Sequence, residues 1–281
     1  MKKKAFVSFL LLCLVLVSVF WNASLKSYYL PIWNMGCAIL LPTLVFPIFL
    51  LEVFFQAGGF YHFLSWISSP KKKKIAYLFC LIFCGFLAGT PSLATMVHHG
   101  IEKGDLTKKE GTKILSFFLF PSFPYLYYLF LQKPSIAPMI IFPILFSCLG
   151  FLLCFRIEEV SMSSFLSEDK VSLTQVSRRV GVKLFDVLAG FLLFSFPGIL
   201  FQQMSNELGK YLLQGLFEFS FPLYQLLQVE RGVCVIGLLL SFSSCSIFYQ
   251  THCLCPEVSI RSIMVTRSCL TLFMVMFFFL L

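Results

Sequence analysis

The segment Ile75–Ser92, with the sequence IAYLFCLIFCGFLAGTPS, is an apolar run that stops before it could cross a membrane. Its uncharged helical part, 75–88, is short, because a helix needs about 20 apolar residues to cross the hydrocarbon core. The next residues, Gly89-Thr90-Pro91-Ser92, cannot continue a regular helix. Pro91 has no amide hydrogen, and it disfavours helical geometry at Thr90. We therefore predict that 75–88 turns back at Gly89–Ser92 as a re-entrant hairpin.

The rest of the chain has the composition of a protein that lies in lipid. Of its 281 residues, 58% are hydrophobic and only 12% are charged, and the mean hydropathy is +0.88. Charged residues make up about twice that share in soluble domains. A water-soluble globule of this size cannot hide so much apolar surface. We predict an all-α, polytopic membrane helix bundle that forms one domain over 1–281. Neither a soluble catalytic domain nor an enzyme activity is expected.

Long apolar runs predict the helices that cross the membrane. The first, 5–21, follows a lysine triplet and precedes no small-x-small cleavage site, so we expect an uncleaved anchor helix with a cytoplasmic N-terminus. Pro42 and Pro47 should kink or break the second run. The one long hydrophilic segment, 156–183, is expected to be a loop with an amphipathic helix. The further predicted spans are 33–51, 114–131, 136–155, 184–201, 232–249 and 262–281.

A second interrupted segment, 211–227, contains the polar residues Gln214, Glu218 and Ser220. A carboxylate at membrane depth is costly, so Glu218 should pair, bind a proton or contact a solute pathway. We predict that this segment is a second re-entrant hairpin, which enters from the opposite face. Opposed broken segments related by an inverted repeat are typical of secondary transporters, whose binding sites lie at the breaks.

The charge distribution favours this topology. The net charge of +9 comes from short basic clusters between apolar runs, such as Lys71–Lys74, which indicates cytoplasmic loops and not nucleic-acid binding. With both hairpins re-entrant, Arg267 and most other basic residues fall on the cytoplasmic side. A topology in which 75–97 crosses the membrane weakens this bias. All but four of the 22 basic residues fall on that side, and the exceptions are Lys26, Lys133, Lys210 and Arg231.

Other ionisable residues have simpler interpretations. Glu52 and Asp186 lie near span ends, where their side chains are expected to reach the headgroups. The sequence His98-His99-x-x-Glu102 lacks the order of a zinc-protease motif and a third ligand nearby, so neither a metal site nor a cofactor is expected. The eleven cysteines are scattered through apolar segments and are expected to be small buried residues.

Three groups of residues are candidates for a solute-binding site. Each has an alternative: a plain helix break, a carboxylate at the membrane interface, or hydroxyls that bond backbone or a neighbouring helix. At the two hairpin tips, backbone groups and polar side chains would face a solute. The candidates are Gly89, Thr90, Pro91 and Ser92 at the first tip, Glu218 and Ser220 at the second, and Ser243, Ser244 and Gln250.

Several of these stretches resemble a known membrane-protein family. Gly85–Ala94 (GFLAGTPSLA) resembles the G-F-x-S-G-Y-P-x-G-A motif of the nucleoside-recognition, or Gate, membrane domain. Glu102–Glu110 (EKGDLTKKE) resembles the E-K-G-x-I-S-K-E-E that follows it in the sporulation integral membrane protein YlbJ family. Further similar stretches occur in the same order, and the Gate-like region covers about 30–270. They are Leu41–Pro47, Gly215–Glu218 and Ser241–Gln250.

The chain departs from the family pattern at polar positions. The family's Asn-Asn pair falls at Leu119 and Phe120, its Thr-Asn-Gly at Ser220-Phe221-Pro222, and its paired glycines at Ser243 and Ser244. The resemblance therefore implies a divergent member with an altered site.

The resemblance implies a multi-pass protein of a bacterial cell membrane that acts in endospore formation. A small polar solute that it binds or moves is one candidate partner besides the bilayer. The alternative is a scaffold with a degenerate solute site, whose partners are other membrane proteins or a second copy of the chain.

Overall fold

The computed structural model describes residues 22–59, 62, 64, 66, 67, 70–154, 172–229 and 232–280. The predicted anchor helix 5–21 lies outside these residues. Within them the chain is helical and contains no strand. Six helical stretches are long and apolar enough to cross a bilayer, which confirms the prediction of an all-α, multi-pass membrane protein. They are Lys26–Phe54, Lys108–Gln132, Pro134–Cys154, Leu173–Phe201, Cys234–Leu254 and Ile260–Phe277.

The same order of elements occurs twice along the chain. A long helix comes first, then a helical hairpin, then a span broken in its middle, and finally an uninterrupted span. In the first half these are α2 (Asn22–Met35) with the π-helical η1 (Gly36–Leu40) and α3 (Leu41–Gln56); α5 (Pro70–Ala88) and α6 (Thr90–Glu102); α7 (Lys108–Phe118) and α8 (Phe123–Gln132); and, after η2 (Pro134–Ile136), α9 (Ala137–Cys154).

The second half repeats the order with shorter hairpin helices. Its elements are α10 (Leu173–Ser195) with the 3₁₀-helical η3 (Phe196–Phe201); α11 (Glu207–Phe217) and α12 (Ser220–Leu226); α13 (Gly232–Phe242) and α14 (Cys245–Leu254); and α15 (Ile260–Leu280).

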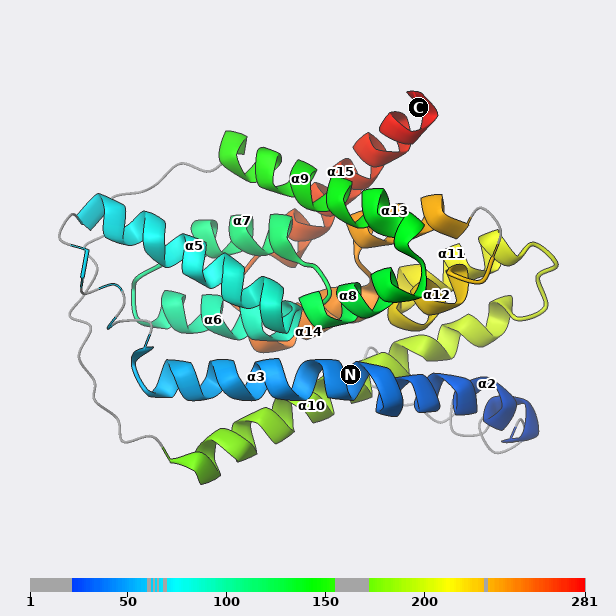
Figure 1. Cartoon of the computed structure of the whole chain (residues 1–281), viewed down its shortest axis with the longest axis horizontal. Helices are drawn as coiled ribbons and strands as arrows, with labels where there is room; N and C mark the ends of the chain where they lie inside the picture. The colour runs from blue at the N-terminus through cyan, green and yellow to red at the C-terminus, as the bar shows by residue number, and fades with distance from the viewer. Residues whose placement is uncertain are drawn as a thin grey trace, which may run out of the picture.

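The two hairpins enter the bundle from opposite ends of its long axis. In Figure 1, α5 and α6 extend from the left end toward the middle, and α11 and α12 extend from the right end. The two halves also interlock, because α3 packs on α10, α15 on α7, and α13 on α9. The hairpin tips therefore lie inside a frame that both halves build.

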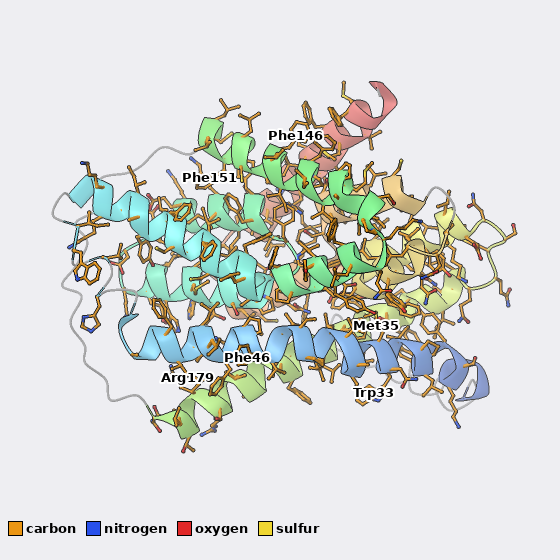
Figure 2. The ribbon with its side chains drawn as sticks, in the orientation of Figure 1. Trp33, Met35, Phe46, Phe146, Phe151 and Arg179 are labelled. Atoms are coloured by element: carbon orange, nitrogen blue, oxygen red, sulfur yellow. The ribbon has the colours of Figure 1, made fainter. Side chains whose placement is uncertain are left out.

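Large apolar side chains cover the outside of this frame. On the α2–α3 helix, Trp33 is 44% exposed and Phe46 is 65% exposed, whereas Met35 is buried (Figure 2). Exposed apolar surface on this scale is a feature of proteins that contact lipid or partners.

The first long helix differs from its prediction. It continues from α2 through α3, so the expected break at Pro42 and Pro47 is wrong, and Figure 1 shows the helix as one extended rod. A π-turn lies directly before Pro42, and the amide of Leu41 bonds the carbonyl of Gly36, five residues back. The wider turn lets the helix pass the residue that cannot donate a hydrogen bond.

The other long helix, α10, also differs. We expected a loop helix up to Lys183 and a separate span from Leu184, but α10 is continuous across that boundary. Its charged early turns face a carboxylate of α3: Lys183 Nζ lies 2.6 Å and Arg179 Nη1 3.6 Å from Glu52. The expectation that Glu52 reaches the headgroups is therefore wrong, since its side chain is buried and paired.

Besides the two hairpin tips, the described residues contain two helix breaks that were not predicted. The predicted spans 114–131 and 232–249 are each divided in the middle, between α7 and α8 and between α13 and α14. Pro121 and Pro124 explain the first division, because neither can donate the amide that a continuous helix requires. At the second, Ser243 adopts a left-handed conformation with φ of 71°. Such backbone persists in a non-glycine residue only where its surroundings hold it.

Candidate functional site

The first hairpin tip is held by backbone geometry. Gly89 has φ of 83° and ψ of −177°, a conformation that L side chains do not readily adopt. A Cβ at this position would lie 3.0 Å from the amide nitrogen of Ser122. The Thr90 hydroxyl donates to the carbonyl of Phe120 at 3.0 Å. The tip between α5 and α6 is thus fastened to the break between α7 and α8.

The second hairpin tip is held by a carboxylate. Glu218 lies at the end of α11 and is buried. Its Oε1 accepts from the amide of Ser220 at 3.0 Å, and its Oε2 accepts from the amide of Phe221 at 3.2 Å. These amides begin α12, so the carboxylate satisfies donors that a helix start leaves unpaired. The Tyr125 hydroxyl on α8 donates to the carbonyl of Ser220 at 2.6 Å.

Both tips line one buried cavity at the centre of the bundle. The two long helices close it with apolar side chains, among them Leu40 and Phe191. Its volume is about 40 Å³, and since one water needs about 10–15 Å³ on this measure, it has room for a few water molecules. Its polar and tip residues are Gly89, Thr90, Pro91, Ser122, Tyr125, Glu218, Ser220, Ser246 and Gln250.

Two buried polar atoms in the cavity wall lack a hydrogen-bond partner. They are Ser122 Oγ and Gln250 Oε1. The amide side of Gln250 is engaged, because Nε2 donates to Ser246 Oγ at 3.2 Å. Buried polar atoms without partners are uncommon in proteins and call for a reason. A water or a polar solute in the cavity would supply one.

Three helices of eight residues or more begin at the same cavity. Thr90 and Pro91 open α6, Ser122 is the residue directly before α8, and Ser246 lies in the first turn of α14. Helix starts present free amides and a partial positive charge. The cavity therefore combines a carboxylate with helix ends of the opposite polarity.

Behind the cavity, Arg267 joins the two broken spans. Its side chain is completely buried on α15. Nη1 donates to the carbonyl of Phe117 at 3.2 Å, and Nη2 donates to those of Leu119 (3.2 Å) and Leu240 (2.6 Å). Nη2 also lies 3.0 Å from Ser243 Oγ. We call this set the Arg267 clasp.

The clasp satisfies carbonyls at the ends of α7 and α13. The last carbonyls of a helix have no partner within it and carry partial negative charge, so a guanidinium suits two such ends at once. The expectation that Arg267 lies with the 250–262 loop is therefore wrong, because its side chain is buried inside the bundle on α15. The signal that could have located it is a single charge inside the apolar run 262–281.

Six of the nine predicted site residues line the cavity and three do not. Ser92 is buried on α6 outside the lining. Ser243 Oγ donates to the carbonyl of Leu119 at 2.9 Å, and Ser244 Oγ accepts from the amide of Ile247 at 3.4 Å as the cap of α14. These two hydroxyls hold the break between α13 and α14. Those that line the cavity are Gly89, Thr90, Pro91, Glu218, Ser220 and Gln250.

Backbone carbonyls are the polar groups at Leu119 and Phe120. Both side chains are apolar and buried. The carbonyl of Leu119 accepts from Ser243 and Arg267, and that of Phe120 accepts from Thr90. The Phe120 ring also faces the Arg267 guanidinium, 4.9 Å from its centroid.

Comparison of the chain with protein-family models, with curated proteins and with solved structures finds no match. The family resemblance therefore stays a prediction. The fold and the candidate site define a multi-pass membrane protein in which two helical hairpins meet at a buried cavity.

Proposed function

We propose that this chain binds a small polar solute between its two hairpin tips and moves it across the membrane. The observation that carries the proposal is that both tips, built from distant parts of the chain, line one cavity that contains Glu218 and two unpartnered polar atoms. Broken helices that meet at the middle of a bundle are the sites of secondary transporters.

The proposal includes an inverted repeat. Three of the six candidate spans lie in each half. An odd number of crossings makes the second half enter the membrane with the opposite orientation, and each hairpin is then re-entrant from its own face. Re-entrant backbone is tolerated when protein or a watery cavity surrounds it, and both tips meet that condition.

Basic residues support a cytoplasmic location for the end where α5 and α6 enter. The opposite end, where α2 begins, α8 ends and α11 begins, has only three basic residues among those described. They are Lys26, Lys133 and Lys210. Arg231 lies outside the described residues. Cytoplasmic loops retain an excess of lysine and arginine. The helix ends and loops at the first end contain Lys72, Lys73, Lys74, Lys103, Lys108, Lys109, Arg178, Arg179 and Arg261.

Movement of either tip would open the cavity toward one end. The first tip is held by the bond from Thr90 to Phe120, and the second by the bond from Tyr125 to Ser220. A solute larger than a few waters enters only if one of these contacts separates. Glu218, Ser122 and Gln250 would then bind it. The resemblance is the ground for proposing that the activity serves endospore formation.

A scaffold without transport is the second candidate. The small volume of the cavity and the apolar side chains of Leu119 and Phe120 favour it. A scaffold would depend on the fold of the tips and not on the charge of Glu218.

The experiment substitutes Glu218→Gln, which retains an acceptor for the α12 amides and removes the charge. A strain that lacks this chain is complemented with wild type, Glu218→Gln or Glu207→Gln, and heat-resistant spores are counted. Glu207 is the matched control, because it is an exposed carboxylate on the same hairpin. We expect Glu218→Gln to lower the spore count at least tenfold at equal membrane levels, and Glu207→Gln to leave it unchanged.

A binding measurement separates solute binding from sporulation. Purified wild type and Glu218→Gln are heated in detergent with each common ribonucleoside as probe. A rise in melting temperature that is confined to wild type supports the site. Full rescue of sporulation by Glu218→Gln would contradict the proposal and leave the scaffold. A normal spore count without the chain would contradict the sporulation role.

A further inference from the structure

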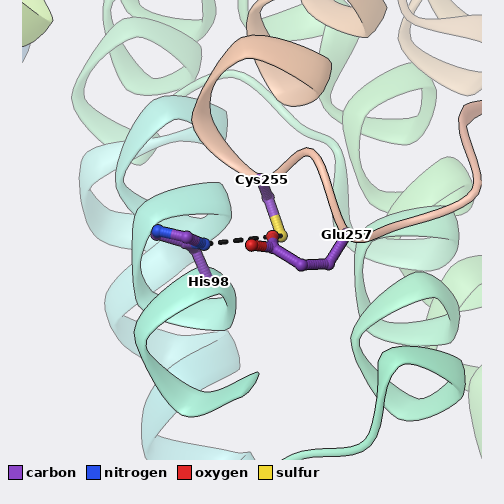
Figure 3. Close-up of side chains that lie close together, drawn as sticks. All are labelled: His98, Cys255 and Glu257. Atoms are coloured by element: carbon purple, nitrogen blue, oxygen red, sulfur yellow. Dashed lines mark hydrogen bonds and ion pairs between the residues drawn. The ribbon is translucent and has the colours of Figure 1, made fainter. Parts of the chain in front are cut away.

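We propose that His98, Cys255 and Glu257 form a zinc-type divalent metal site at the end of the bundle where α5 and α6 enter. Figure 3 shows the three side chains converging, His98 from α6 and the other two from the loop between α14 and α15. Their donor atoms all lie within 4.8 Å of one another. This inference is independent of the proposed function.

The spacing of the donors suits a tetrahedral ion. His98 Nδ1 lies 3.0 Å from Glu257 Oε2, and Cys255 Sγ lies 3.6 Å from the same oxygen. Zinc bonds of about 2.0–2.1 Å to nitrogen and oxygen and about 2.3 Å to sulfur place such donors roughly 3.3–3.6 Å apart at tetrahedral angles. Two of the three pairs are therefore close to this spacing, and the third, between His98 and Cys255, lies within 4.8 Å, so side-chain movements of about an ångström would bring all three donors to bonding distance.

A fourth residue, Glu102, lies beside the second ring nitrogen of the histidine. His98 Nε2 lies 3.4 Å from Glu102 Oε1, one helical turn further along α6. A metal-binding histidine almost always donates its second ring nitrogen to a carboxylate, a carbonyl or water, which fixes the tautomer that leaves the first nitrogen free. A bond from His98 Nε2 to Glu102 in the metal-bound site would leave Nδ1 for the ion, on the side of Cys255 and Glu257.

The loop that contributes two of the donors is held in place. The amide of Cys255 donates to the carbonyl of Thr251 at 2.9 Å and closes α14. At the other end of the loop, the amide of Ser259 donates to the Thr112 hydroxyl of α7 at 3.2 Å. Cys255 is fully buried, which shields its sulfur. A site that needs little rearrangement costs little ordering entropy when the ion binds.

The donors also select the class of ion and leave a path to it. Nitrogen, sulfur and oxygen together suit zinc, whereas calcium and magnesium take oxygen ligands. The side chains of His98 and Glu257 are about a quarter exposed, at 25% and 24%. An ion can enter from that side and keep a water as its fourth ligand. It would fasten the base of the first hairpin to the second half of the chain.

The alternative is an ion pair between His98 and Glu257 with no metal. Sequence spacing could not reveal the cluster, because Glu257 lies 159 positions from His98. The prediction of no metal site rested on the residues that neighbour His98 in the sequence, and neither Cys255 nor Glu257 is among them.

The experiment uses the full chain, purified in detergent, with cobalt(II) as a spectroscopic probe and zinc as a competitor. Wild type should take up one ion with thiolate-to-cobalt charge-transfer absorption and the d–d bands of a tetrahedral site. Zinc should displace these bands and raise the melting temperature. Cys255→Ser should lose the charge-transfer band, and Cys253→Ser should keep it. Cys253 is the matched control, since it is exposed and lies outside the cluster.

Glu102→Gln tests the orienting role while all three donors stay in place. We expect it to weaken zinc affinity about 10- to 100-fold. It also provides an intact site should Cys255→Ser fail to fold. Absence of the charge-transfer band in wild type would overturn the proposal. An equal band in wild type and Cys255→Ser would do the same, because it would assign the bound cobalt to another cysteine.

Discussion

The two hairpin tips occupy equivalent places in the two halves of the chain and are built from different chemistry. The first turns at Gly89, where the positive φ of the glycine and its close packing against Ser122 form the turn. The second turns at Glu218, whose carboxylate bonds the first amides of α12. Equivalent folds therefore do not produce equivalent sites: only the second tip brings a carboxylate to the cavity.

The broken spans differ in the same way. The break between α7 and α8 contains Pro121, and that between α13 and α14 contains the left-handed Ser243. A single guanidinium on α15 serves both breaks. The corresponding helix of the first half, α9, contains no charged residue. The second half thus supplies the charge at the cavity and the charge behind it.

Loss of the Arg267 clasp should destabilise the fold more than any other substitution considered, because it disturbs both helix breaks at once. Arg267→Met removes the guanidinium donors from the buried carbonyls of Phe117 and Leu240 and leaves that of Leu119 with Ser243 alone, and we expect it to destabilise the fold by about 3–5 kcal/mol. Melting temperature and monodispersity in detergent measure the loss. The melting temperature of Arg267→Lys should lie between those of wild type and Arg267→Met, since lysine keeps the charge but has fewer hydrogen-bond donors. Arg261→Met is the control, because Arg261 is exposed on the same helix. A stable Arg267→Met protein would remove the clasp from the structural account.

A side chain at the first tip should have the next largest effect. Gly89→Ala puts a residue with a Cβ into a conformation that favours glycine and brings that Cβ against the backbone of Ser122. We expect a loss of about 2–3 kcal/mol in stability. Gly104→Ala separates the two causes, because Gly104 has φ of 77° and open space around it. An equal loss at both positions would show that close packing against Ser122 contributes nothing.

The smallest effect is expected from the two hydroxyls that fasten the tips, and it should be local. Thr90→Val and Tyr125→Phe each remove one buried hydrogen bond, which is worth about 1 kcal/mol. Hydrogen exchange should rise around residues 86–94 in Thr90→Val and around 216–224 in Tyr125→Phe. Such separate responses would indicate that the tips open independently. A rise at both tips in either variant would instead indicate that they move together.

Much of the fold could be predicted from local sequence. Apolar runs of about 20 residues predict spans, and the short run before Gly89-Thr90-Pro91-Ser92 predicts a helix that stops early. The polar residues Glu218 and Ser220 mark the second interruption in the same local way. Pro42 and Pro47 led to the wrong prediction of a helix break, because the helix accommodates them with a π-turn and continues.

The site depends on contacts between distant residues and was only partly predictable. Only the tertiary structure marks Ser122 as a site residue, because its unpartnered hydroxyl lies in the cavity wall. Arg267 looked like one more basic residue near a span end, and only the packing of α15 on α7 brings it to two helix ends. The metal cluster likewise joins α6 to a loop near the end of the chain.

By itself, the sequence determined that this protein lies in a membrane, how its spans are ordered and where two helices must stop. Those properties follow from solvation and backbone hydrogen bonding, which act within a few turns of each residue. The tertiary structure alone decided that both tips meet at one cavity, that Arg267 bonds to both helix breaks, and that His98 lies next to Cys255 and Glu257. These depend on how helices that are distant in sequence pack together. Such packing requires complementary surfaces from different segments, so the sequence of one segment does not reveal it.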